Sequence, residues 1–163
     1  AIYTRIRSIT LPEDVLKGRE FEDYILGLFN LQEENKFVLK EWQGDKTLGD
    51  ICPESNRYPD FVFDYQGQGF AIECKWRQRL THDIIQDLFP SDKLFVYQQF
   101  SKERNIPVSI VLGVGGEPSN PVQLYNIPLF QIPYIIASQK SIAEFLRPST
   151  DVPFHITDLI SEK

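Results

Sequence analysis

Apolar residues recur at two spacings along the chain, and each spacing predicts a different kind of element. Between Pro12 and Phe29 they recur every three or four residues, which predicts a helix. Proline suits the first turn of a helix, so the helix is expected to begin near Pro12. The stripe that this helix turns to the core is Phe21, Ile25, Leu28 and Phe29.

Shorter apolar runs, bounded by polar, glycine or proline residues, predict strands. The clear runs are Phe37–Trp42, Phe61–Tyr65, Phe70–Trp76 and Pro107–Val114, and weaker ones are Val122–Tyr125 and Tyr134–Ala137. Further helices are expected over Thr81–Phe89, from a Ser91 cap to Arg104, and over Ser138–Leu146, with a short helix or frayed end in the last residues. This mixture indicates an α/β fold in which helices cover one sheet.

Length and composition favour a single folded domain. The 163 residues, 42% of them hydrophobic, suffice for one core, so residues 1–163 are read as one domain. No apolar run approaches the roughly 20 residues that a membrane-spanning helix needs, and no signal peptide is evident. Two cysteines make neither a zinc site nor a disulfide framework, which suits a cytoplasmic setting. The missing initial Met leaves a longer parent protein open.

The two central strands flank Gln66-Gly67-Gln68-Gly69, which predicts a β-hairpin. A type II′ turn at Gly67 and Gln68 would pair Val62 with Glu73 and Asp60 with Lys75. Side chains alternate along a strand, so Asp60, Glu73 and Lys75 are expected on one face of the hairpin. The opposite face is apolar and must lie against the core, which fixes the register.

Asp60 and Glu73 would then be diagonal neighbours, close enough to share one ion. Mg²⁺ commonly binds one or two carboxylates and keeps several waters. Lys75, beside both acids, is placed to bind a phosphate oxygen or the attacking water. The net charge of −6 argues against a general nucleic-acid coat but is compatible with a site of this kind.

Pro59-Asp60 and Glu73-Cys74-Lys75, with Glu73 thirteen positions after Asp60, resemble the motif of the PD-(D/E)XK nuclease superfamily. The segment Gly18-Arg19-Glu20-Phe21-Glu22 resembles the helix that carries an additional acid in that family. The resemblance covers about Lys17 to Val114. It implies a three-layer α/β/α sandwich with a central mixed sheet, the restriction-endonuclease-like fold, and Mg²⁺- or Mn²⁺-dependent cleavage of phosphodiesters.

The resemblance also implies roles for individual residues. Asp60, Glu73 and the Cys74 backbone carbonyl would bind the metal, and Lys75 would help to activate water and stabilise the transition state. Glu22 would support the metal or orient Lys75. The family often has a glutamine on the helix after the motif; Gln98 and Gln99 are candidates, and Gln98 is preferred.

Several alternatives remain open at this point. Arg77 and Arg79 continue the alternation of Lys75, so they are candidates for contacts with backbone phosphates, or they lie on a solvated edge. DNA is the expected partner, with RNA as the alternative, and the chain is either monomeric or a homodimer. The competing function is a nuclease-fold module that binds nucleic acid or a protein partner but does not cut.

Overall fold

The computed structural model of the chain describes residues 12–29, 36–43, 58–89 and 92–160. Its helices are α2 (Glu13–Leu28), α3 (Ile84–Leu88), α4 (Lys93–Arg104), α5 (Ile132–Ser138) and α6 (Ile156–Leu159). Its strands are β1 (Phe37–Trp42), β2 (Phe61–Tyr65), β3 (Gln68–Arg77), β4 (Val108–Val114) and β5 (Gln123–Pro128). None of the described helices is long and apolar enough to cross a membrane.

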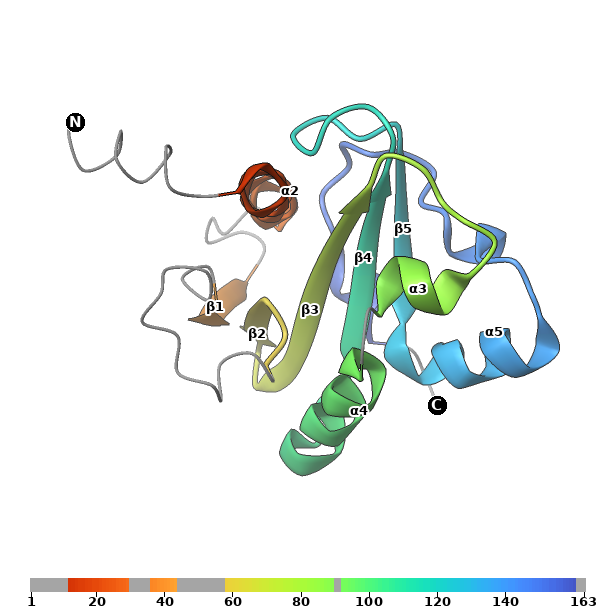
Figure 1. Cartoon of the computed structure of the whole chain (residues 1–163). Coiled ribbons are helices and arrows are strands. Elements are labelled where there is room, and N and C mark those ends of the chain that lie inside the picture. The colour runs from red at the N-terminus through yellow and green to blue at the C-terminus, as the bar shows by residue number, and fades with distance from the viewer. Residues whose placement is uncertain (1–11, 30–35, 44–57, 90–91, 161–163) are drawn as a thin grey trace, which may run out of the picture.

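The five strands form one mixed sheet in the order β1-β2-β3-β4-β5. Only β3 and β4 run parallel, and the crossover between them carries α3 and α4. One face of the sheet packs on α2 and α6, and the other on α3, α4 and α5, so each face has its own apolar core (Figure 1). The fold is therefore the three-layer α/β/α sandwich that was expected, with the expected order of helix, strand, hairpin, helix and strand.

Helix α2 is fixed on the sheet by aromatic packing. All four residues of the predicted stripe are buried, and the ring of Phe29 stacks on Phe63 with centroids 4.3 Å apart. At Gly113 on β4, an added Cβ would lie 2.4 Å from an edge atom of the Phe21 ring. Glycine therefore permits the close approach that sets α2, and with it Glu22, against the middle of the sheet.

The hairpin forms, but its predicted register was wrong by two residues. Phe61 pairs with Ile72 and Tyr65 with Gln68, so the turn is Gln66-Gly67 and not Gly67-Gln68. Both turn residues have positive φ, 51° and 90°, which is the pattern of a type I′ turn and not of type II′. A shift of two residues preserves the alternation of faces, so Glu73 and Lys75 still project to the side predicted for them.

Two other predictions failed in the C-terminal part. Tyr134–Ala137 is not a strand but lies in α5, and Ser138–Leu146 is mostly irregular, with one 3₁₀ turn at Ala143–Phe145. The short helix expected near the end is α6. The predicted cap Ser91 lies outside the described residues, and α4 follows Asp92, which makes no side-chain capping hydrogen bond.

Candidate active site

The candidate site lies where β2 stops and β3 continues. Asp60 directly precedes β2, and extending the observed register by one residue places it opposite Glu73. The backbone carbonyl of Asp60 accepts a hydrogen bond from the Gln43 amide at 2.9 Å, which continues the pairing with β1. Its side-chain Oδ2 accepts a hydrogen bond from the Cys74 amide at 2.8 Å. The carboxylate therefore bridges β2 and β3 at the point where their backbones separate.

This separation opens a cavity of about 220 Å³ that reaches both helical layers. The acids Asp60 and Glu73 are nearly buried, with 6% and 2% of their surfaces exposed, whereas Lys75 is half-buried. The cavity is lined by Val15, Gly18, Arg19, Glu22, Gln43, Asp60, Glu73, Cys74, Lys75, Lys93 and Tyr97. The structure thus brings together every residue that was predicted for the chemical centre.

Glu22 and Cys74 reach the cavity from different elements. Glu22 comes from α2, which the Phe21 contact with Gly113 holds against the sheet. The amide of Cys74 points toward Asp60, and the N–H and C=O of an extended residue lie on the same side of its strand. The Cys74 carbonyl therefore also points to the β2 side of β3, as its predicted role requires.

Tyr97 of α4 is a site residue that the sequence did not reveal. Its aromatic position predicts core packing, and it is indeed only 2% exposed. Its phenol, however, faces Glu73. Burial, then the charge of the Glu73 carboxylate and its hydrogen bond with the phenol, raise the pKa of Tyr97 well above its ordinary value, and the charge of Asp60 adds to the shift. The phenol thus stays protonated and donates to Glu73.

This pKa shift predicts a specific alkaline instability. Because the pKa is raised on folding, the stabilisation is complete below about pH 10 and is lost as pH rises, by about 1.4 kcal/mol per pH unit. Between about pH 9 and pH 11, the Tyr97→Phe variant should therefore lose roughly 1.4 kcal/mol less unfolding free energy than the parent. Urea unfolding at the two pH values measures this loss of unfolding free energy, and Tyr134→Phe, at an exposed tyrosine, is the control. Equal losses in the Tyr97→Phe and Tyr134→Phe variants would contradict the assignment.

The predicted glutamine does not line this cavity. Gln98 lines a different one, with Ser101, Lys102 and Pro107 among its neighbours, and Gln99 lines neither. The face of α4 that reaches the site carries Lys93 and Tyr97, which are four residues apart and therefore lie one above the other. The helix after the motif thus lines the cavity with a lysine and a tyrosine and not with the predicted glutamine.

The two arginines after Lys75 lie outside the cavity. Arg77 ends β3, and its guanidinium donates to the backbone carbonyl of Trp76 at 2.8 Å. Arg79 is exposed beyond the strand. Both residues lie farther along the chain from the acids than Lys75 does. Any contact that they make with a polymer would therefore lie beside the cavity that holds the acids.

The donor set suits a hard divalent cation. Two nearly buried carboxylates face each other across the ends of β2 and β3, and oxygen is the ligand atom that Mg²⁺ prefers. Among the described residues, no group of three or more His, Cys, Asp or Glu side chains is arranged to hold a metal ion. Mg²⁺ needs only one or two carboxylates and completes its shell with water or substrate, so the pair is sufficient.

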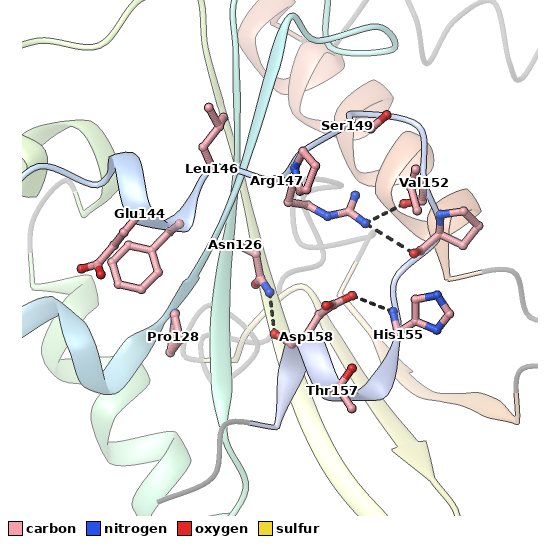
Figure 2. A pocket seen from close by; sticks show the side chains of 13 residues that line it. Asn126, Pro128, Glu144, Leu146, Arg147, Ser149, Val152, His155, Thr157 and Asp158 are labelled. Carbon is pink, nitrogen blue, oxygen red and sulfur yellow. Dashed lines mark hydrogen bonds between the residues drawn. The ribbon is translucent and has the colours of Figure 1, made fainter.

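A larger cavity of about 510 Å³ lies between β5 and the segment that ends at α6 (Figure 2). The arginine in this cavity makes structural contacts. Arg147 donates to the Val152 carbonyl at 2.6 Å, and its guanidinium lies 4.0 Å from the centroid of the Phe154 ring. Burial lowers the pKa of Arg147. Asn126 likewise donates to the Asp158 carbonyl at 2.7 Å. These contacts hold the C-terminal segment against the sheet. The larger volume of this cavity therefore does not make it the candidate active site.

Comparison with solved structures gave partial structural likenesses. No model of a protein family matches the chain, and no curated protein matches it. Among solved structures, the chain is similar to Hjc, a Holliday junction resolvase from the hyperthermophilic archaeon Archaeoglobus fulgidus. The match has a TM-score of 0.46 and 17% sequence identity, and it covers 71% of this chain and 75% of that one.

Proposed function

We propose that the chain is a metal-dependent nuclease that hydrolyses phosphodiester bonds in DNA. The observation that carries this proposal is the convergence of Asp60, Glu73 and Lys75 in one cavity at the split between β2 and β3. Three charged side chains rarely gather in a nearly buried place for stability alone, since burying charge is costly. Two acids and an amine are what hydrolysis of a phosphodiester by a bound Mg²⁺ or Mn²⁺ requires.

The acids would hold the metal. Asp60 and Glu73 would supply carboxylate oxygens, and the Cys74 carbonyl would supply a neutral one. A bound divalent cation lowers the pKa of water and neutralises charge that develops on phosphorus. The hydrogen bond from the Cys74 amide orients the Asp60 carboxylate, and the Tyr97 phenol orients that of Glu73. A carboxylate has about four acceptor sites, so each retains capacity for the ion.

Lys75 supplies a positive charge beside the reacting phosphate. It binds a phosphate oxygen and stabilises the negative charge of the transition state, and the nearly buried surroundings strengthen this interaction relative to bulk water. Glu22, on the α2 wall, orients Lys75. Arg77 and Arg79 contact phosphates farther along the strand and carry no sequence preference.

The direct test is cleavage of supercoiled and linear plasmid DNA with Mg²⁺ or with a chelator. We expect cleavage with Mg²⁺ or Mn²⁺ and none with the chelator. Conversion of supercoils to nicked circles would identify an endonuclease, whereas loss of linear ends alone would identify an exonuclease. A labelled RNA in parallel distinguishes the two polymers. Equal products with and without metal would reject the proposal.

The second candidate is a nuclease-fold module that binds a partner without cutting. The acidic net charge of −6 favours it, because a DNA enzyme of this size more often carries a basic excess. Titration with Mn²⁺ separates the two functions. Micromolar affinity that disappears in Glu73→Ala argues for the nuclease, whereas the non-cutting module binds no metal at these residues.

A further inference from the structure

Two cations to which no role has been given so far line the candidate site on opposite walls. Arg19 comes from α2, which covers one face of the sheet, and Lys93 comes from the first turn of α4, which covers the other. Between them lie Asp60, Glu73 and Lys75. The cavity that holds the acids is therefore lined by one such cation from each helical layer.

Both side chains are half-buried. The other basic residues described on α2 and α4, which are Lys17, Lys102 and Arg104, do not line this cavity. Lys102, also on α4, is exposed and lies away from the acids, beside the cavity of Gln98. Arg19 and Lys93 are thus the cations of α2 and α4 that line the acid-containing cavity.

The charges of the cavity indicate what it can bind. Its lining carries three acids, Glu22, Asp60 and Glu73, and three cations, Arg19, Lys75 and Lys93, so its formal charge is zero. A bound divalent cation would change this to +2, which would balance the −2 charge of two phosphodiester groups. Without Arg19 and Lys93, the same cavity would have a formal charge of zero when the metal is bound.

We propose that Arg19 and Lys93 bind the DNA backbone phosphates on either side of the one that is cut. This inference rests on the proposed function. Arg19, with its forked guanidinium, suits two-point contact with a phosphate, and Lys93 acts as a compact point charge. The two residues hold the strand across the split between β2 and β3, and Lys75 remains with the scissile phosphate.

The test measures binding, not cutting. In a Lys75→Ala background, the affinity for a DNA duplex is measured in the presence of Mg²⁺ at several salt concentrations. Removing one phosphate contact should reduce the slope of log K against log salt by about 0.9, and should weaken binding about eightfold at roughly 0.1 M salt. We expect this for Arg19→Ala and for Lys93→Ala. Lys102→Ala, which removes the same group from the same helix, should change neither quantity.

Conservative variants separate charge from folding. Lys93→Arg and Arg19→Lys should retain the slope of the parent, because each keeps a cation at its position. This inference alone would be overturned if Arg19→Ala and Lys93→Ala had the same slope as the parent, while the protein with Lys75 present cuts DNA. A parent that neither binds nor cuts DNA would overturn it together with the proposed function.

Discussion

Replacement of Asp60 by asparagine is expected to reduce the rate of DNA cleavage by on the order of 10³-fold or more. The substitution removes one of the two carboxylate charges that we propose hold the metal. It retains an oxygen at the position of Oδ2, so the hydrogen bond from the Cys74 amide can persist. The rate is measured on supercoiled DNA at saturating Mg²⁺, with thermal unfolding as the check on the fold.

Asp64→Asn is the matched control. Asp64 lies on the same strand, β2, and its Oδ2 also accepts a hydrogen bond from a backbone amide, that of Gly67, at 3.0 Å. It caps the hairpin turn and does not line the cavity. Cleavage by this variant should equal that of the parent. The assignment fails if Asp60→Asn and Asp64→Asn cut at the same rate.

Lys75→Ala is expected to lower the rate of cleavage by on the order of 10²-fold while metal binding is retained. In the proposed function the lysine stabilises charge on the phosphate, whereas the acids and the Cys74 carbonyl hold the metal. Rates at saturating metal and Mn²⁺ titration measure the two effects separately. The exposed Lys40→Ala on β1 is the control for loss of a positive charge. Loss of Mn²⁺ binding in Lys75→Ala would contradict this division of roles.

The arrangement of the motif was predictable because it depends on alternation and not on the turn. The sequence pattern placed Glu73 and Lys75 on one face of β3, and the structure has them there although the register differs by two residues. The turn was mispredicted because Gln66 adopts a positive φ, for which glutamine has no special preference. The hydrogen bond from the Gly67 amide to the Asp64 carboxylate offsets some of that cost.

The failure at Tyr134–Ala137 has a different cause. This apolar run is short and contains β-branched residues, so it resembles a strand when taken alone. In the structure Ile132 and Ile135 are buried one helical turn apart, and Pro133 occupies the first turn of α5. A proline at this position is a helix-start signal, and it outweighs the strand preference of the β-branched residues that follow it.

The contribution of α4 to the site could not be read from the sequence. Helical spacing shows that Lys93 and Tyr97 share a face, but it does not show what that face meets. Only the packing of α4 on the sheet brings the Tyr97 phenol to Glu73. Expectation from family resemblance favoured Gln98, which lies about 100° around the helix from Tyr97 and lines another cavity.

Crystals soaked in Mn²⁺ give the most direct test of the central claim, that two acids at the split between β2 and β3 share one ion. An anomalous difference map should show a peak between Asp60 and Glu73 in the parent protein, and no such peak in Glu73→Ala. A peak at another place, with no peak between these two carboxylates at saturating Mn²⁺, would contradict the account.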